Sequence, residues 1–377
     1  MWLEIGDPRG NEVCLRWGDE GLWAKYYVSL DNLQRAAGEV RTGLARLTRW
    51  AASKQREELP LILHELTTAG FHLYYALFDA KSNRNAAYDV QDWMRQAYEK
   101  QKQKKQEDGT ESAECDLSVV ADPSMHVPWG LVFEADDLPG LQPDVRSTSF
   151  GNFWGLKYEL AAVFDGVNPS DALARPAKQC RLLSLLHRDY ADEAHARLGN
   201  LLGRPLGIKL TYELCREALR NIEPGDTIFH YIGHHHDGVL DLGYGAKVSM
   251  TDFKILMDEL TGGRRRMPGQ WCGLLFINGC EGAFGDGDYS FADVANREGL
   301  FGLISTESIV PKDDAIEFSR QFLTALFDEG KTIGQTMHHL RRDESMWPLS
   351  LLYSCYAQPK YKIVPEIGTP AAQGTPA

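Results

Sequence analysis

The chain has 377 residues, of which 43% are apolar and 25% charged, and a formal net charge of −13, which is typical of a globular protein with a sizeable core. The acidic balance excludes a general nucleic-acid binder, because that function needs a basic surface to neutralise phosphates. No apolar run approaches the roughly 20 residues of a membrane-spanning helix, and the first residues, MWLEIGDPRG, lack the features of a signal peptide, so we expect a cytoplasmic protein that contacts no membrane.

The N-terminal quarter predicts a hairpin followed by helices. Residues 1–28 alternate apolar and polar types around Gly18 and Gly21, which indicates two short antiparallel strands. From residue 32 to about residue 98, apolar residues recur at spacings of three and four, which indicates two or three long helices. We therefore expect residues 1–99 to form an N-terminal hairpin and helical region.

A strongly polar segment follows this region. Residues 100–114, KQKQKKQEDGTESAE, contain a single alanine and otherwise charged or polar residues and one glycine, which predicts a flexible polar loop. Exposed polar loops are readily cut by proteases, so a second interpretation makes this loop a site of proteolytic processing.

Residues 115–363 predict an α/β domain, because short apolar runs alternate with amphipathic stretches. The predicted strands are 117–121, 180–186, 227–232, 272–277 and 300–305. The predicted helices are 189–203, 211–220, 251–261, 312–328 and 332–342. This alternation is typical of a mostly parallel sheet with helices on both faces. Residues 364–377 are rich in Pro, Gly and Ala, and we expect them to be a disordered tail.

Two of the predicted strands end in residues that can carry chemistry. One runs into three consecutive histidines that begin at His234, and the other runs into Cys280. In open parallel sheets, functional groups collect outside the carboxyl ends of the strands. One strand–helix–strand crossover fills the 46 residues between His234 and Cys280, so the two side chains can face each other.

A histidine beside a cysteine has the chemistry of a cysteine peptidase. The imidazole generates the thiolate and later protonates the leaving amine. Backbone N–H groups near the nucleophile must bind the developing oxyanion. Gly279 and Gly282 flank Cys280 and permit a sharp turn that presents such groups.

The residues around both positions resemble the motifs of CHAT domains, the caspase-like peptidases of the caspase and separase group. The histidine motif is FHYIGH, which ends at His234, and the cysteine motif is LLFINGCEGA, which contains Cys280. The resemblance covers roughly residues 115–363. It implies an α/β fold with a caspase-like, mostly parallel sheet and helices on both faces, preceded by a helical N-terminal portion. It also implies that His234 is the base, that Cys280 is the nucleophile, and that the backbone amides of His235 and Cys280 bind the oxyanion.

One position departs from the family pattern, because His235 stands where these domains usually have glycine. A side chain restricts the backbone at a position that needs a positive φ. Two alternatives stay open for this reason. In one, His235 is the base; in the other, the domain is catalytically impaired and acts as a regulatory or scaffold subunit.

Neither a metal nor an organic cofactor is expected. Adjacent side chains of an extended chain point to opposite faces, so the three consecutive histidines cannot all bind one ion. The chain has no HExxH motif, no CxxC pair among its seven cysteines, no phosphate-binding loop and no GxSxG motif. Most of the cysteines are expected to be small buried apolar residues.

Four carboxylates are candidates for binding the substrate. By analogy with caspases, the segment after the strand at 300–305 lines the pocket for the residue before the cut. That segment contains Glu307 and Asp313, while Asp237 lies near the His motif and Glu281 near the Cys motif. Together, these four carboxylates would favour a basic residue of the substrate. Alternatively, Asp313 caps the following helix and Glu281 makes a structural hydrogen bond.

The resemblance also implies the biological setting. Peptidases of this family are often controlled effectors in bacterial defence or cell-death systems. We therefore expect a specific protein substrate, and control by a separate regulatory protein or by the N-terminal helices.

Overall fold

A computed structural model gives the fold and describes most of the chain from Met1 to Val364. The residues that it does not describe are 20–21, 54–57, 109–115, 122–124, 126, 143, 165–172, 178–179, 203–207, 210–225, 237–238, 244, 250, 256–272, 280–289, 298–299 and 365–377. Among the described residues, no helix combines the length and the apolar character needed to cross a membrane.

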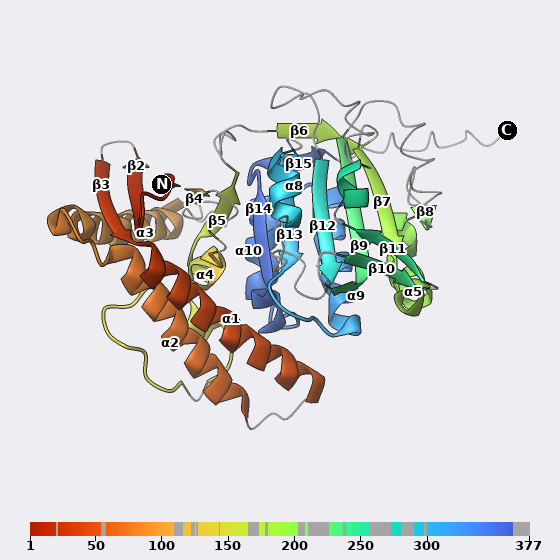
Figure 1. The fold of residues 1–377 in the computed structure, drawn as a ribbon, viewed down its shortest axis with the longest axis horizontal. Coiled ribbons are helices and arrows are strands. Elements are labelled where there is room, and N and C mark those ends of the chain that lie inside the picture. Colours follow the sequence, from red (N-terminus) through yellow and green to blue (C-terminus); the bar gives the residue numbers. More distant parts are fainter. Residues whose placement is uncertain are drawn as a thin grey trace.

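One large mixed sheet organises the molecule (Figure 1). Its strands follow the order β11-β10-β9-β12-β13-β14-β5-β4-β1-β2-β3, and β7 and β8 continue from β9. β7, β9, β12 and β13 are parallel to one another, and β14 returns antiparallel. These strands are β1 (Trp2–Ile5), β2 (Glu12–Asp19), β3 (Leu22–Ser29), β4 (Asp116–Val120), β5 (Glu159–Val163), β7 (Cys180–Leu186), β8 (Ile208–Lys209), β9 (Asp226–His236), β10 (Val239–Gly243), β11 (Ala246–Ser249), β12 (Gly273–Gly279), β13 (Gly302–Thr306) and β14 (Tyr353–Ala357). β6 (Leu173–Pro176) and β15 (Tyr361–Val364) form a separate parallel pair.

Helices cover both faces of the parallel strands, as the alternation along β9 shows. Phe229 packs edge-on against Phe253, with ring centroids 5.2 Å apart, and Phe253 packs in the same way against Phe291 of α8. The next residue, His230, lies on the other face and contacts α9. The helices are α1 (Leu30–Ser53), α2 (Leu59–Phe78), α3 (Arg84–Asp108), α4 (Trp154–Lys157), α5 (Arg188–Leu202), α8 (Phe291–Arg297), α9 (Lys312–Phe327) and α10 (Ile333–Arg342), with short 3-10 turns at Trp129–Leu131, Ser147–Phe150 and Leu349–Leu352.

The predicted N-terminal hairpin is present as β2 and β3, and it belongs to the large sheet. β1 pairs with β2 on one side and, in parallel, with β4 on the other, so that Leu3 lies opposite Val119. The sheet therefore runs without a break from the N-terminal strands into the strands of the predicted α/β region. The helices α1 and α2 pack side by side below this part of the sheet (Figure 1).

The polar segment 100–114 starts as helix and not as loop. α3 runs to Asp108, because Lys, Gln and Glu are good helix formers and extend a helix that has already begun. The expectation of a loop is wrong for residues 100–108. The tail predicted for residues 364–377 starts one residue too early, because Val364 is the last residue of β15. Residues 109–114 and 365–377 and the predicted helix 211–220 lie outside the described residues.

Local sequence signals explain several element ends. The Thr332 hydroxyl accepts a hydrogen bond from the N–H of Gln335, and the Gln335 side chain accepts one from the N–H of Thr332, which forms a capping box at the start of α10. α9 begins directly after Pro311, whose fixed φ suits a helix start.

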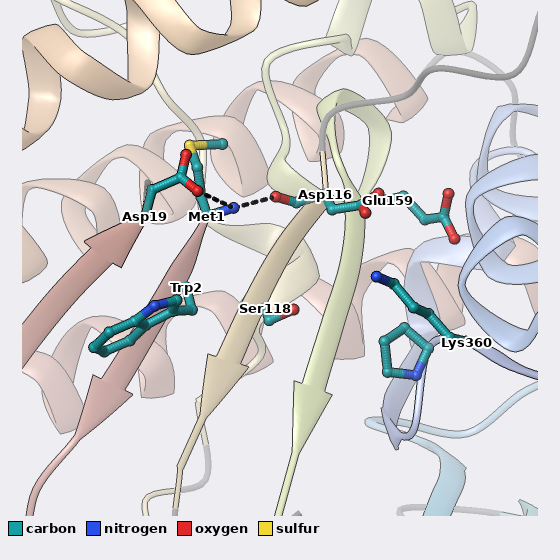
Figure 2. Close-up of a pocket in the computed structure, with 8 residues that line it drawn as sticks. Met1, Trp2, Asp19, Asp116, Ser118, Glu159 and Lys360 are labelled. Atoms are coloured by element: carbon teal, nitrogen blue, oxygen red, sulfur yellow. Dashed lines mark hydrogen bonds and ion pairs between the residues drawn. The ribbon is translucent and has the colours of Figure 1, made fainter. Parts of the chain in front are cut away.

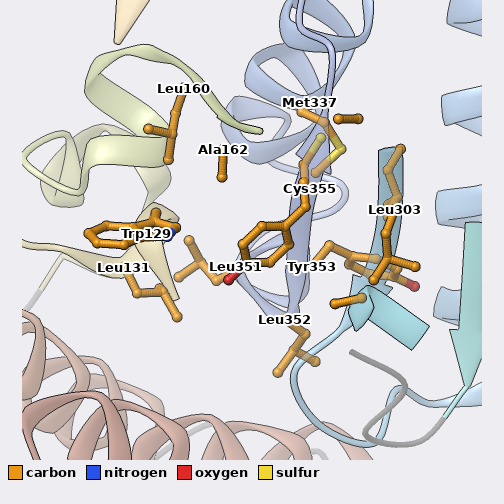
Figure 3. Close-up of a cluster of buried hydrophobic side chains, with 14 of the residues drawn as sticks. Trp129, Leu131, Leu160, Ala162, Leu303, Met337, Leu351, Leu352, Tyr353 and Cys355 are labelled. Carbon is orange, nitrogen blue, oxygen red and sulfur yellow. The ribbon is translucent and has the colours of Figure 1, made fainter. Parts of the chain in front are cut away.

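Apolar side chains fill the space between the sheet and its helices. Figure 3 shows the part of the core where β5, β13 and β14 meet, formed by Trp129, Leu131, Leu160, Ala162, Leu303, Met337, Leu351, Leu352, Tyr353 and Cys355. Cys14, Cys180 and Cys355 are buried, as expected of small apolar residues. The other four cysteines lie outside the described residues.

A buried polar network crosses this core and fixes α9 to the sheet. The two ring nitrogens of His230 lie 2.9 Å from Ser184 Oγ on β7 and 3.0 Å from Ser319 Oγ on α9. Asn278 on β12 donates to Ser319 and accepts from the Tyr353 hydroxyl at 2.9 Å. Burial lowers the pKa of His230 to about 3, so the ring is neutral at physiological pH.

Candidate functional site

The candidate site lies where β9 and β12 end side by side. The two strands are parallel, and their register pairs Gly233 with Gly279. His234 follows Gly233 in the chain and Cys280 follows Gly279. Gly279 is the last residue described before the gap 280–289, so Cys280 and Glu281 lie outside the described residues, as does Asp237.

His234 is exposed and packs against residues that follow β7. Its ring centroid is 4.7 Å from that of His187 and 5.3 Å from that of Tyr190, both in edge-on contacts. His187 is 4% exposed, and its N–H donates to the carbonyl of Ile232 at 2.8 Å, which extends the parallel ladder between β7 and β9. One imidazole at the site is therefore held in place and the other faces solvent.

Two carboxylates flank the buried imidazole of His187. The N–H of Asp189 donates to His187 Nδ1 at 3.2 Å. The carboxylate of Asp189 lies 3.8 Å from the same nitrogen, and that of Asp241 on β10 lies 3.8 Å from Nε2. Burial, together with the neighbouring His234, lowers the pKa of His187, which favours a neutral ring.

His235 lies on the opposite face of β9 from His234. It is 5% exposed, and its ring packs edge-on against Phe291 of α8 with centroids 5.4 Å apart. The prediction that neighbouring histidines point to opposite faces is thereby confirmed for this pair. A Cβ added at Gly279 would lie 3.1 Å from the Cβ of His235, so the end of β12 packs closely against this part of β9.

Two hydroxyl groups fix the strand ends. The Tyr231 hydroxyl lies 2.6 Å from the carbonyl of His234 and 2.7 Å from that of Asp241, so it bridges β9 and β10. The buried Thr306 hydroxyl at the end of β13 donates to the carbonyl of Gly279. Both contacts restrain backbone within one or two residues of the candidate dyad.

The two described residues proposed for the substrate, Glu307 and Asp313, contact different helices. Glu307 is buried; its carboxylate pairs with Arg41 of α1 at 3.4 Å and accepts a hydrogen bond from Ser354. Burial raises the pKa of Glu307, and Arg41 opposes that rise. Asp313 is exposed in the first turn of α9, and its carbonyl faces Arg197 of α5. It is not the cap of that helix, because the N-cap is Pro311 and no side chain caps it.

The segment after β7 contributes side chains to the site that the His and Cys motifs do not reveal. His187 and Asp189 directly follow the predicted strand 180–186, which is the same position that singled out His234 and Cys280. Ligand atoms of His187, Asp189 and His234 lie within 4.8 Å of one another. The signal that would have found them is the carboxyl end of a neighbouring parallel strand.

Two of the cavities that the described residues form lie away from this site. One of about 380 Å³ runs between α1 and α2. Figure 2 shows the other, of about 160 Å³, between the N-terminal strands and the segment before β15; its lining residues are Met1, Trp2, Asp19, Asp116, Ser118, Glu159, Pro359 and Lys360.

Comparisons with known proteins give a structural likeness alone. No model of a protein family matches the sequence, and no curated protein matches it. A separase–securin complex of Saccharomyces cerevisiae at 2.6 Å resolution resembles 96% of this chain with a TM-score of 0.52 and 10% identity. A second separase–securin structure from the same organism (TM-score 0.42, 13% identity, 66% of this chain) and a structure described as a protease (0.45, 11%, 73% of this chain and 68% of that one) are less similar.

The likeness concerns a part of much longer chains. This chain spans 30% and 16% of the two separase-complex chains that it matches. The match to the separase–securin structure of 2.6 Å resolution nevertheless includes the N-terminal strands and helices together with the parallel strands, since it covers nearly the whole of this chain. Together with the sheet order and the helices on both faces, it shows that the chain has a caspase-like α/β fold.

Proposed function

We propose that the protein is a cysteine endopeptidase in which His234 and Cys280 form the catalytic dyad. The observation that carries the proposal is the register of β9 and β12, which pairs Gly233 with Gly279. Each catalytic residue comes one position after a member of that pair. Neighbouring strands lie about 4.8 Å apart, so an imidazole and a thiol that leave this edge together are within reach of each other.

The accessibility of the two histidines favours His234 over His235 as the base. His234 is exposed at the edge of the sheet, whereas the ring of His235 is buried against Phe291. A general base must reach both the nucleophile and the leaving group of the substrate. The exposed ring meets this requirement and the buried ring does not.

The reaction then follows the chemistry of the two groups. His234 takes the proton of the Cys280 thiol, and the thiolate attacks the carbonyl carbon of the scissile peptide bond. The backbone amides of His235 and Cys280 bind the oxyanion. The carbon–nitrogen bond breaks as His234 protonates the leaving amine, which leaves a thioester on Cys280. Water, deprotonated by His234, hydrolyses the thioester and restores both residues.

The substrate proposed for this site is a specific protein with a basic residue before the cut. Asp313, Asp237 and Glu281 are the carboxylates proposed to favour that residue. Glu307 belongs to the same set, but a substrate side chain that reached it would have to displace Arg41. On the resemblance to CHAT domains, we propose a controlled effector of a bacterial defence or cell-death system with a regulatory protein partner.

The test is a labelling experiment followed by a cleavage experiment. A peptidyl electrophile with a basic residue should modify Cys280 in the full chain and fail on the Cys280→Ala variant, whereas the Cys14→Ala variant should label as the wild type does. Substrate candidates encoded beside this protein should be cut by the wild type alone. Labelling that is unchanged in Cys280→Ala would exclude this nucleophile. A reactive Cys280 without any cut that depends on it would favour the regulatory or scaffold role.

A further inference from the structure

We propose that His187, Asp189 and His234 form a binding site for a transition-metal ion, and that Zn²⁺ is the ion that fits it best. One ligand atom from each residue lies within 4.8 Å of the other two. The site is made by two neighbouring strands, since His187 and Asp189 follow β7 and His234 lies on β9, one residue past its last pair with β12. Of the three consecutive histidines it uses His234 alone, since His235 points to the opposite face.

The donor set selects the kind of ion. Imidazole nitrogens suit zinc, copper and nickel, whereas calcium and magnesium prefer sites made of oxygen alone. Two histidines and one carboxylate match the three protein ligands of many zinc sites, in which water takes the fourth position. Asp241 lies 3.8 Å from His187 Nε2 and adds a second negative charge beside the site, which further favours a divalent cation.

The geometry needs a small adjustment that the exposed side chains can make. Zinc lies about 2.0 Å from its nitrogen and oxygen ligands, so ligand atoms in a tetrahedral site are closer together than the 4.8 Å limit found here. The side chain of Asp189 is 58% exposed and that of His187 is 6% exposed. His187 therefore forms the fixed wall of the site, while Asp189 and His234 are free to turn toward the ion.

Two contacts compete with the ion. The N–H of Asp189 donates to His187 Nδ1 at 3.2 Å, so an ion bound at that nitrogen would have to displace this hydrogen bond. Arg188 Nε lies 3.1 Å from Asp189 Oδ1, whereas the other carboxylate oxygen, Oδ2, is the one near His187. Both members of that ion pair are about half exposed, and exposed pairs of this kind are weak. The guanidinium therefore leaves one oxygen available to a metal.

A bound ion would also control the reaction. An imidazole that coordinates zinc has no lone pair left to take a proton from a thiol, so zinc would hold His234 in an inactive state. This consequence rests on the function proposed above, whereas the binding does not.

The binding test uses the full-length protein after treatment with a chelator. Zn²⁺ is titrated in competition with a chromogenic chelator, and Co²⁺ is added to a second sample to read the coordination geometry from its absorption spectrum. The wild type should bind one equivalent with a tetrahedral cobalt spectrum. His234→Gln and Asp189→Asn should each weaken binding by at least about tenfold, because even the loss of a residue that only supports a ligand costs about 10- to 100-fold.

The control variant is His339→Gln, which removes an exposed histidine from α10 and should bind as the wild type does. His187→Gln is a further test. Because the His187 side chain is buried, circular dichroism must first show that this variant folds. If the His187→Gln variant does not fold, Asp189→Asn still tests the site. Unchanged zinc affinity in both His234→Gln and Asp189→Asn, or an octahedral cobalt spectrum, would overturn the site.

A separate arm distinguishes a failure of the site from a failure of the peptidase proposal. The Cys280→Ala variant should bind zinc like the wild type, whether or not the protein is a peptidase. In the wild type, zinc should slow the labelling of Cys280, and it should slow it much less in Asp189→Asn. Equal slowing in both would show that zinc acts on the thiol itself and would contradict control through this site.

Discussion

At the scale of single residues, His230 is the clearest case of a buried group whose charge state matters. Its folded pKa of about 3 lies below the value of about 6.5 expected in an unfolded chain. The unfolded state therefore binds more protons in the window between these values. The stability that depends on a neutral His230 is present above pH 6.5 and is lost as the pH falls through that window.

The His230→Phe variant tests this dependence. At pH 7.5, we expect the free energy of unfolding to fall by about 1–3 kcal/mol, because the hydroxyls of Ser184 and Ser319 lose a buried partner. Below pH 6.5, the wild type should lose up to about 1.4 kcal/mol per pH unit more than the variant. Urea unfolding at pH 7.5 and 5.0 measures both quantities. If the wild type and the variant lost equal free energies of unfolding between pH 7.5 and pH 5.0, the neutral state assigned to His230 would be contradicted.

The Gly233→Ala variant tests whether close packing around Gly233 holds the catalytic residues in position. A Cβ at this position would lie 2.5 Å from the Tyr231 hydroxyl oxygen and 2.6 Å from the Cβ of His187, so Gly233→Ala must displace both side chains. A misplacement of about 1 Å at a reacting group costs about 100-fold in rate, and we expect a loss of that order in the labelling rate of Cys280. The control is Gly199→Ala on α5, where a Cβ meets nothing within 4 Å; an equal effect of the two variants would contradict the packing argument.

At the scale of elements, the pair of Arg41 and Glu307 joins α1 to the segment after β13. The side chain of Glu307 is 1% exposed and that of Arg41 is 30% exposed. Removal of either partner therefore has unequal consequences. Arg41→Gln leaves a buried carboxylate without its cation, whereas Glu307→Gln leaves an arginine that water can still reach.

We expect Arg41→Gln to lower the free energy of unfolding at pH 7.5 by about 1–3 kcal/mol, the cost of leaving a buried acceptor without its donor, and Glu307→Gln to lower it by less. Burial already raises the pKa of Glu307, and loss of Arg41 raises it further. The variant's deficit should therefore be full at neutral pH and shrink as the pH falls toward about 4.5, because a carboxyl with a raised pKa takes up its proton above that ordinary value. Chemical unfolding across this range measures the deficit, and a deficit that grows in acid would contradict the assignment.

The elements also show what the sequence could predict. The strand 180–186 was predicted at its observed bounds, because a buried parallel strand is a continuous apolar run. β9 extends past its predicted end because His234, His235 and His236 pair with β10, and that pairing depends on a hairpin partner. Neighbouring strands cannot be read from periodicity, so the position of His187 beside His234, and the pairing of β1 with β4, appeared only in three dimensions.

The same limit applies to the buried polar groups. The members of this network come from four elements that are far apart in the chain, and each occupies a buried position that apolar side chains otherwise fill; they are Ser184, His230, Asn278 and Ser319. Their pairing depends on the strand register and on the position of α9. A one-residue shift of any strand would turn these side chains to the other face.

At the scale of the whole molecule, the sheet makes the N-terminal region and the α/β region one structure. β4 is paired on one side with β1 and on the other with β5. A Cβ at Gly70 of α2 would lie 2.4 Å from the carbonyl of Leu131, so the helices also touch the α/β region closely. Removal of the N-terminal residues would leave the edge of β4 unpaired and apolar surface uncovered.

We therefore expect a chain of residues 115–363 to aggregate on its own, while the full chain stays soluble under the same conditions. Expression of both, followed by size-exclusion chromatography, checks this expectation. A folded, monomeric product from the shorter chain, with Cys280 as reactive as in the full chain, would show that the predicted boundary near residue 99 separates independent units.

In the proposed dyad, His234 and Cys280 meet at the ends of β9 and β12, and a crosslink measures this directly. Two cysteines join when their Cα atoms are about 4.4–6.8 Å apart. Mild oxidation of the His234→Cys variant should therefore produce a disulfide between positions 234 and 280, identified by mass spectrometry of the digested protein. The His235→Cys variant is the control, since residue 235 points to the other face. A 234–280 crosslink that forms in preference to 235–280 is the predicted result; no crosslink from position 234, or a stronger one from position 235, would contradict the proposed dyad.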